Sequence, residues 1–239
     1  MAKHKIILKS GRLLAIGDVH GCLKALKNLL NQVDPQSEDT VIMLGDYIDR
    51  GPDSKGVIDY LLNWEWKASL VYLKGNHELI MKHALQSKLH SDHWKEVGGQ
   101  ATLDSYGGDL EKVPEAHWDF MDGARYFYET EEFIFVHGGL NPRQPLLDQN
   151  QEEICWLRFR DAKPHKSGKL IICGHTVQKK GWPTDKGFAI CIDTAVCRGG
   201  FLTCLDVERG RFWQVSESGE SRTGKLPRKL RKKRRTEKH

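Results

Sequence analysis

The fold of this chain is decided by the stretch Leu13-Leu14-Ala15-Ile16-Gly17-Asp18-Val19-His20-Gly21. Its first four residues form an uninterrupted apolar run, which is typical of a strand buried on both faces. The glycine that follows allows the chain to turn sharply. Beyond the turn stand Asp18 and His20, whose side chains can bind a metal ion. The stretch therefore predicts a buried strand with metal ligands at its carboxyl end.

The same unit recurs four more times along the 239 residues. Each time an apolar run leads, directly or through a glycine, to polar residues that can bind metal. The four runs are 41–46, ending in Asp46; 70–77, ending in Asn76 and His77; 133–137, ending in His137; and 170–175, ending in His175. Because ligands of open α/β sheets bind outside the carboxyl ends of the strands, we expect these side chains to meet in one crevice. A single Gly-Asp pair would only indicate a turn, whereas five such ends indicate a site.

Helical patterns separate the first strands. Residues 22–33 place their leucines on one face, and residues 54–64 repeat this spacing. The alternation of strand and helix predicts an α/β sheet with right-handed crossovers. After the last unit, short apolar runs at 188–193, 201–207 and 211–215 are separated by turn residues and predict an antiparallel meander.

The stretch between the third and fourth units has a different character. Residues 79–128 are helical in pattern at first and rich in tryptophan, histidine and charge, so we expect a helical cover beside the site. Residues 1–224 are expected to form one domain that includes this cover. Four tryptophans are expected to pack the core and the cover rather than to stack on bases: Trp64, Trp66, Trp94 and Trp118.

The polar residues at the strand ends form a set of oxygen and nitrogen ligands. The set contains two carboxylates, one amide and three imidazoles: Asp18, His20, Asp46, Asn76, His137 and His175. Such a set suits manganese, iron or zinc and lacks the thiolates of a copper or iron–sulfur site. Six ligands are too many for one ion that also holds water, whereas two ions about 3.5–4 Å apart can share them through Asp46. We therefore expect two divalent metal ions, with Mn²⁺ as the first choice and iron or zinc as alternatives.

Five motifs, in this order, resemble the signature series of the phosphoprotein phosphatase family. They are GDVHG (17–21), GDYIDRG (45–51), GNHE (75–78), HGG (137–139) and GHT (174–176). The bacterial and phage serine/threonine protein phosphatases are the nearest likeness, and the resemblance spans residues 12–207. It implies a calcineurin-like metallophosphoesterase fold of the α/β class. In that fold two mixed sheets form a β-sandwich flanked by helices, with a two-metal site at the carboxyl ends of the strands.

The resemblance assigns the metal ligands and the proton donor. The first ion would be held by Asp18, His20 and Asp46, and the second by Asp46, Asn76, His137 and His175. A hydroxide between the ions would attack phosphorus in line. The residue similar to the family's general acid is His77, a role worth roughly 10²–10⁴-fold in rate.

Three further residues are assigned by the same resemblance. Asp49 would orient the imidazole of His77 and favour its charged form. Arg50 would bind the phosphate oxygens in a bidentate manner. The family's second phosphate-binding arginine corresponds to Arg158, with Arg160 as the alternative.

The resemblance implies that the protein hydrolyses phosphomonoesters. The substrates would be phosphorylated proteins or small phosphomonoesters, and the leading interpretation is a serine/threonine protein phosphatase. The alternative is a dinucleoside (diadenosine) tetraphosphate hydrolase, which resembles this chain through the same strand-end motifs. Those enzymes usually lack an aspartate at the position of Asp49 and have one where Glu78 stands, so both residues favour the protein phosphatase. The segment 192–200 departs from the eukaryotic phosphatases, whose longer C-terminal loops shape grooves for protein substrates.

Two other functions are disfavoured. A nuclease cleaves an internal phosphodiester, whereas Arg50 and Arg158 would bind a terminal phosphate. A binding module without activity would require a damaged site, and every expected ligand is present.

Charge is distributed unevenly along the chain. From 225 to 239 there are nine Lys or Arg residues and one Glu, so this segment carries +8 and the remaining chain −3, for a net charge of +5. Almost no apolar residue follows Leu230, and we expect a disordered tail. The tail is either incidental or an arm that contacts nucleic acid or another polyanion through counterion release.

Composition bears on where the protein works. No run of about 18 apolar residues is present, so we expect no transmembrane helix. The apolar stretch Ile6-Ile7-Leu8 is too short for a secretion signal. The six cysteines include no CxxC pair, which disfavours a disulfide framework or a zinc site built from cysteines. We expect a cytoplasmic monomer without membrane contact.

Overall fold

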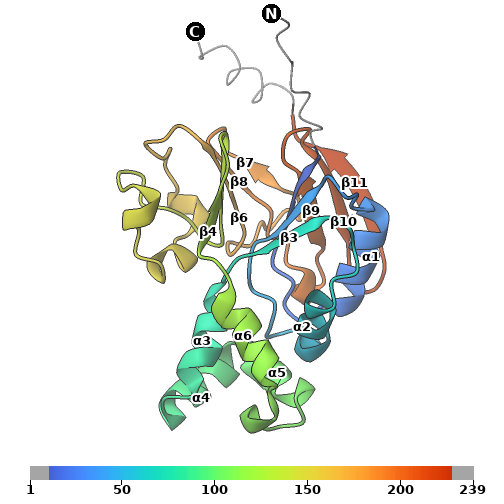
Figure 1. Ribbon diagram of the computed structural model, residues 1–239, viewed down its shortest axis with the longest axis vertical. Coiled ribbons are helices and arrows are strands. Elements are labelled where there is room, and N and C mark those ends of the chain that lie inside the picture. Colours follow the sequence, from blue (N-terminus) through green and yellow to red (C-terminus); the bar gives the residue numbers. More distant parts are fainter. Residues whose placement is uncertain (1–10, 228–239) are drawn as a thin grey trace, which may run out of the picture.

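Two β-sheets pack face to face in the structure, a computed structural model that describes residues 11–227, and helices flank them (Figure 1). One sheet has six strands in the order β11-β10-β9-β1-β2-β3, and the other has five in the order β4-β5-β6-β8-β7. Both sheets mix parallel and antiparallel neighbours. The predicted arrangement of two mixed sheets flanked by helices is confirmed.

The six-stranded sheet combines a parallel half with an antiparallel half. The parallel strands are β1 (Leu13–Ile16), β2 (Thr40–Met43) and β3 (Ser69–Tyr72). The antiparallel strands are β9 (Leu202–Asp206), β10 (Arg211–Val215) and β11 (Ser221–Lys225). Strand β9 pairs with β1 and joins the two halves.

The five-stranded sheet is built around three parallel strands. These are β5 (Phe133–Val136), β6 (Leu170–Cys173) and β8 (Ala189–Cys191), with β4 (Phe127–Glu129) and β7 (Thr184–Asp185) antiparallel at the edges. The prediction that residues 188–193 begin the meander is wrong, because β8 pairs in parallel with β6. Ala189 and Ile190 are buried on opposite faces of β8, as in a central parallel strand.

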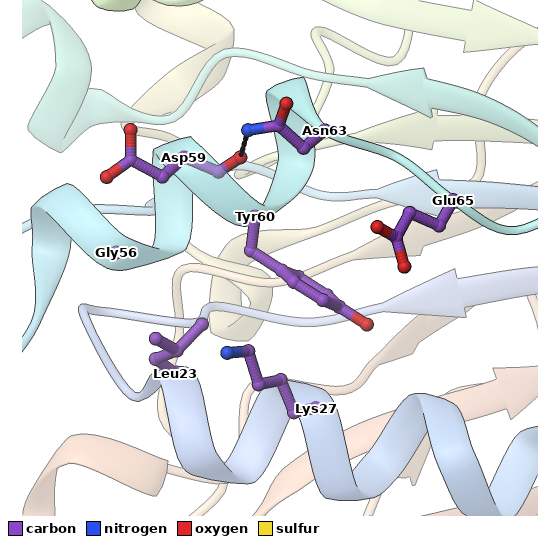
Figure 2. A pocket seen from close by; sticks show the side chains of 7 residues that line it. All are labelled: Leu23, Lys27, Gly56, Asp59, Tyr60, Asn63 and Glu65. Atoms are coloured by element: carbon purple, nitrogen blue, oxygen red, sulfur yellow. Dashed lines mark hydrogen bonds between the residues drawn. The ribbon is translucent and has the colours of Figure 1, made fainter.

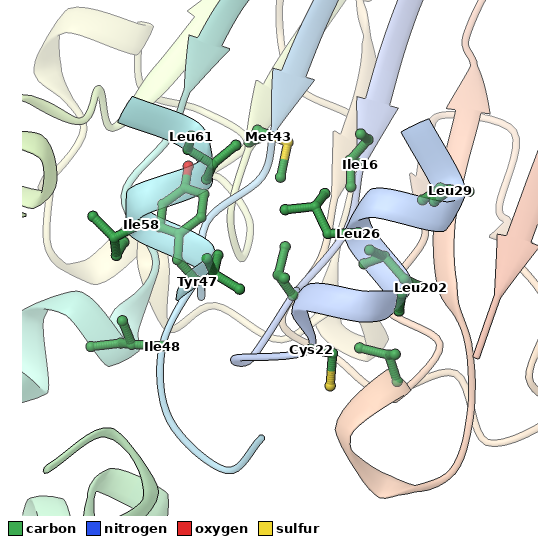
Figure 3. Packing of buried hydrophobic residues seen from close by; sticks show 14 of the residues in the cluster. Ile16, Cys22, Leu26, Leu29, Met43, Tyr47, Ile48, Ile58, Leu61 and Leu202 are labelled. Atoms are coloured by element: carbon green, nitrogen blue, oxygen red, sulfur yellow. The ribbon is translucent and has the colours of Figure 1, made fainter. Parts of the chain in front are cut away.

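The core lies in layers because side chains alternate along each strand. Ala15 of β1 packs between the sheets, together with Phe135 of β5 and Ile172 of β6. Leu14 and Ile16 of the same strand belong to a different cluster, on the other face of the sheet. Figure 3 shows Ile16 in this cluster, beneath the helices. The apolar runs were continuous because both faces of these strands are covered.

Two helices cover the outer face of the six-stranded sheet. They are α1 (Leu23–Val33) and α2 (Ser54–Leu62). Their apolar stripes, with Leu26 of α1 and Ile58 of α2, enter the same cluster as Ile16 (Figure 3). Helix α2 begins after Asp53, whose carboxylate accepts a hydrogen bond from the backbone N–H of Gly56 at 2.8 Å.

The helical cover projects from one end of the sheets (Figure 1). It contains α3 (Asn76–Ala84), α4 (Lys88–Trp94), a kinked segment (Lys95–Gly99), α5 (Gln100–Ser105), a 3₁₀ turn (Leu110–Lys112) and α6 (Glu115–Gly123). The predicted limits of 79–128 are corrected at both ends. The cover begins at Asn76, inside the third motif, and residues 127–129 form the edge strand β4 instead.

The predicted boundary between body and tail also lies too early. Lys225 pairs with Arg211 in the sheet, Leu226 is buried, and its N–H donates to the carbonyl of Gly210 at 2.9 Å. The sequence placed both residues in the tail because the basic run begins there. The rest of the predicted tail, 228–239, lies outside the described residues.

Within residues 11–227, no helix has the length and apolar character needed to cross a membrane.

Replacing Leu26 by alanine tests the packing of α1 on the sheet. Leu26 has no exposed surface, so Leu26→Ala should lower the free energy of unfolding by about 2–5 kcal/mol in a urea titration. The exposed Asn28 on the same helix is the matched control, and Asn28→Ala should change stability by no more than about 0.5 kcal/mol. Equal effects of the two substitutions would contradict this packing.

Candidate metal centre

The predicted ligands gather where parallel strands of the two sheets end. Asp18 and His20 follow β1, Asp46 follows β2, Asn76 follows β3, and His137 and His175 follow β5 and β6. Two groups could each hold an ion, because their ligand atoms lie within 4.8 Å of one another: His20, Asp46 and His77, and Asp46, His137 and His175. Asp46 belongs to both groups, which fits the expectation of a shared carboxylate.

The backbone at these strand ends is held in an uncommon conformation. His20, Asp46 and His175 have φ angles of 46°, 52° and 61°, in the left-handed region. Hydrogen bonds between motifs hold them there: the N–H groups of Val19 and His20 both donate to the carbonyl of Asp46, at 3.0 and 2.8 Å. The first motif (17–21) and the second (45–51) thus stabilise each other's backbone conformation.

Two glycines allow the backbone to approach the carboxylates. A Cβ on Gly174 would overlap Oδ1 of Asp18, and a Cβ on Gly75 would overlap Oδ1 of Asp46. Any side chain at these positions would displace a ligand. The glycines of the motifs therefore serve close packing around the centre.

Three imidazoles present a ring nitrogen to the centre. Nδ1 of His20 donates to the carbonyl of Ile48 and Nδ1 of His137 to that of Leu44, both at 2.8 Å, which directs Nε2 inward. Nε2 of His175 is buried without a hydrogen-bond partner. Because buried polar atoms almost always have a partner, this nitrogen fits a metal ligand.

Electrostatics favour a cation in this place. Burial, reinforced by Asp193, raises the pKa of Asp18 well above its usual value. Burial also lowers the pKa of His20 and of His175 to about 3, so both rings are neutral, as metal ligation requires. Burial alone would lower the pKa of His137, but Asp46 raises it to about 10.

His137 lies next to Asp46, with acceptors facing both of its ring nitrogens. Its Nε2 lies 3.0 Å from Oδ1 of Asn76 and 3.3 Å from Oδ1 of Asp46, while Nδ1 donates elsewhere. Both ring nitrogens thus face acceptors, as in an imidazolium. A divalent ion bound between these groups would replace that proton.

His77 pairs with Asp49. Its Nδ1 lies 2.6 Å from Oδ2 of Asp49, and both side chains are almost fully buried. The ring of His77 meets the ring of His20 edge to face, with centroids 4.8 Å apart. A carboxylate behind an imidazole suits a proton donor and also a metal ligand, so the role of His77 stays a prediction.

The arginines lie at the rim of the centre. Nη1 of Arg50 is 2.6 Å from Nε2 of His20. The charge of Arg158 contributes to the lowered pKa of His175, after burial and His137. The side chain of Arg160 is 79% exposed and pairs with Asp161, so Arg158 is the better placed of the two.

Sequence reasoning missed several residues of the centre. Asp193 is buried beside Asp18 and follows the apolar run of β8, so the strand-end pattern could have found it. Trp94, which the sequence predicts to pack, is fully buried and also donates from Nε1 to the carboxylate of Asp49. Thr102 contacts the same carboxylate. No pattern of the cover marked these last two residues as part of a site.

A hollow between α1 and α2 lies apart from the centre (Figure 2). It is lined by Leu23, Lys27, Gly56, Asp59, Tyr60, Asn63 and Glu65. None of the predicted site residues borders it. Its lysine and tyrosine contact each other, with Nζ of Lys27 5.3 Å from the ring centre of Tyr60.

Removal of metal should destabilise the protein, since a cation offsets the charge of the buried Asp18 and Asp46. We expect dialysis against EDTA to lower the Tm by about 5–10 °C, and Mn²⁺ to restore it. The control is Asp46→Asn, which removes the shared ligand and should show no Mn²⁺-dependent shift. A Tm that does not respond to either treatment would contradict a resident metal.

His77→Asn distinguishes a proton donor from a ligand. If His77 is the donor, the variant keeps the metal content of the parent protein, measured by mass spectrometry of the dialysed protein, while kcat for a phosphate ester with an alkoxide leaving group falls by about 10²–10⁴-fold. The control is His83→Asn on the same helix α3, which should keep both quantities. Loss of an ion from His77→Asn would make His77 a ligand.

Several known proteins are similar to this chain in sequence. The symmetrical bis(5'-nucleosyl)-tetraphosphatase of Proteus mirabilis is 45% identical over 135 residues, covering 55% of this chain and 45% of that protein. The enzyme of the same name from Buchnera aphidicola is 26% identical over 160 residues, covering 66% and 54%. The chain thus spans about half the length of these relatives. For the Citrobacter koseri enzyme of that name the match is 25% identical and covers 88% of this chain and 96% of that one.

Solved structures share the fold. A candidate diadenosine tetraphosphatase has a TM-score of 0.64 at 20% identity, covering 91% of this chain and 94% of that chain. A protein serine/threonine phosphatase from Saccharomyces cerevisiae has a TM-score of 0.60 at 16% identity, covering 91% and 81%. At such identities the likeness shows the fold alone. Residues 11–190 match the model of one family, and the chain belongs to the calcineurin-like phosphoesterases.

Proposed function

We propose that this phosphoesterase uses two divalent ions and that His77 protonates the leaving group. The observation that carries the proposal is the buried contact of 2.6 Å between Nδ1 of His77 and Oδ2 of Asp49, close to Asp46, which belongs to both groups that could hold an ion. A buried carboxylate stabilises the imidazolium and fixes its orientation.

The ions would be held by the residues that the sequence predicts. Asp18, His20 and Asp46 would bind the first ion, and Asp46, Asn76, His137 and His175 the second, with Mn²⁺ the first choice and iron or zinc the alternatives. Once bound, they would supply Lewis-acid stabilisation of charge on the phosphate oxygens and on a water nucleophile.

The chain's own side chains perform the remaining steps. Arg50 and Arg158 would bind the oxygens of the phosphate and hold it for in-line attack. As the oxygen of water bonds to phosphorus, the bond to the leaving oxygen breaks, and that oxygen takes the proton of Nε2 of His77. The attacking water releases one proton to solvent, and His77 takes up a proton from solvent before the next turnover. Asp49 retains its hydrogen bond to Nδ1 throughout and keeps the ring in place.

We place a symmetrical dinucleoside tetraphosphate first among the substrates. Relatives that carry this activity in their names support this choice, including one matched over 96% of its length. This reverses the order expected from the sequence alone, which put the protein phosphatase first. The product of symmetrical cleavage would be two nucleoside diphosphates.

Phosphoserine or phosphothreonine in a protein is the second candidate, and the Asp49–His77 pair is the observation that favours it. A serine alkoxide is a poor leaving group and requires a proton, whereas a nucleoside diphosphate leaves as a stable anion. Asp49 and Glu78 are also the residues in which this chain resembles protein phosphatases.

A panel of substrates with Mn²⁺ tests the proposal. We expect kcat/KM for diadenosine tetraphosphate to exceed that for a phosphoserine peptide by about tenfold or more, with ADP as the product. The opposite ranking would favour the protein phosphatase. No turnover of these substrates or of p-nitrophenyl phosphate would contradict the proposed function.

A further inference from the structure

The helical cover contributes two side chains to the carboxylate of Asp49. Nε1 of Trp94, the last residue of α4, lies 3.0 Å from Oδ1 and 3.1 Å from Oδ2. Oγ1 of Thr102 in α5 donates to Oδ1 at 2.7 Å. Trp94, Thr102 and Asp49 have no exposed surface. These contacts lie on the side of Asp49 that faces the helical cover, behind the proposed proton donor.

The acceptors of this carboxylate are satisfied by the protein itself. Oδ1 receives Thr102 and Trp94, while Oδ2 receives Trp94 and Nδ1 of His77. Two of these donors are neutral, and only His77 can bring a charge. The neutral donors stabilise the ionised form of this buried carboxylate and leave its charge to the imidazolium.

The same segment holds the backbone of the second motif. The N–H of Asp49, whose φ is 72°, donates to Oγ1 of Thr102 at 2.7 Å, and the N–H of Arg50 donates to the carbonyl of Gly98 at 2.9 Å. Thr102 therefore accepts from the main chain of Asp49 and donates to its side chain. A residue that only packed at this position would make neither hydrogen bond, so both contacts depend on the hydroxyl group of Thr102.

A kink between α4 and α5 brings Trp94 and Thr102 to the same carboxylate. It lies within Lys95–Gly99, where Gly98 has a φ of 124° and a ψ of 0°, outside the helical region. A glycine adopts such a φ without steric cost, so the chain can change direction between the two donors.

We infer that Trp94 and Thr102 are positioning residues for general-acid catalysis, acting through Asp49 on His77. The inference rests on the proposed role of His77 and extends the machinery of the reaction into the cover. Without either donor, the carboxylate of Asp49 is held less firmly in place and its ionised form is less stabilised, so it orients His77 less well for protonation of the leaving group. The loss should be large when the leaving group is an alkoxide and small when it is a stable anion.

The variants are chosen to remove one donor each and to keep the shape. Trp94→Phe deletes the indole N–H, and Thr102→Val deletes the hydroxyl, whereas Thr102→Ser retains it. Trp64→Phe is the control, because the indole of Trp64 donates to the carbonyl of Ala68 at 2.8 Å, away from the centre.

The kinetic test compares two esters with Mn²⁺ present, p-nitrophenyl phosphate and a phosphoserine peptide. Trp94→Phe and Thr102→Val should each lower kcat for the peptide by about 10–100-fold and for p-nitrophenyl phosphate by less than about threefold. Thr102→Ser and Trp64→Phe should leave both values near those of the parent protein. Equal losses on the two esters, or no loss, would overturn the inference.

A second measurement does not depend on turnover. In the Zn²⁺-loaded protein, the Nδ1 proton of His77 should give a downfield proton NMR signal, identified by its absence in His77→Asn. We expect this signal in the parent protein and in Thr102→Ser, and its shift or loss in Trp94→Phe and Thr102→Val. An unchanged signal in both variants would refute the inference, whether or not either ester is a substrate. Lack of turnover of both esters would count separately, against the proposed function.

Discussion

The buried negative charge between the two sheets is the constraint on which the rest of the structure depends. Asp18, Asp46 and Asp193 lie together at the strand ends, each no more than 4% exposed. An ionised carboxylate is costly to bury unless other groups compensate it. Backbone N–H groups do part of this: His175 donates to both oxygens of Asp18, and His77 donates to Oδ1 of Asp46 at 3.0 Å. Imidazoles and, in our proposal, two cations do the rest.

This compensation requires a backbone that most residues avoid. Of the seven non-glycine residues with positive φ in the described part of the chain, five belong to the centre: His20, Asp46, Asp49, Arg50 and His175. Each such conformation costs about 1–3 kcal/mol and persists only when its surroundings hold it. Here Glu78 is one of the groups that hold it, because its carboxylate accepts from the N–H groups of Asp46, Tyr47 and Gly75. The strained backbone at the strand ends lowers the stability of the fold. In return it holds the side chains of the centre in position, so that they need little rearrangement to bind ions.

The sequence predicted the fold and the centre where a local pattern carried the information. An apolar run followed by a turn and a polar residue is visible in one dimension, so the ends of β1, β2, β3, β5 and β6 were found. The pairing of strands has no such local pattern. The sequence predicted β8 as part of the antiparallel meander, but in the structure it pairs with β6 in the five-stranded sheet. Trp94 and Thr102 could not be found, because their partner Asp49 is 45 and 53 residues away in the chain. The substrate could not be predicted either, since ester and anhydride hydrolysis require the same ligands.

The spacing of the metal centre along the chain has a consequence for how the protein is made. The bonds from His175 to Asp18 join residues 157 positions apart. During synthesis the first motif therefore leaves the ribosome long before its last partner exists. Early strands can pair locally, but the carboxylates have no complete set of neighbours until β6 docks. The high contact order of this one site makes it a late event in folding, and an occupied centre marks a chain whose two sheets have already come together.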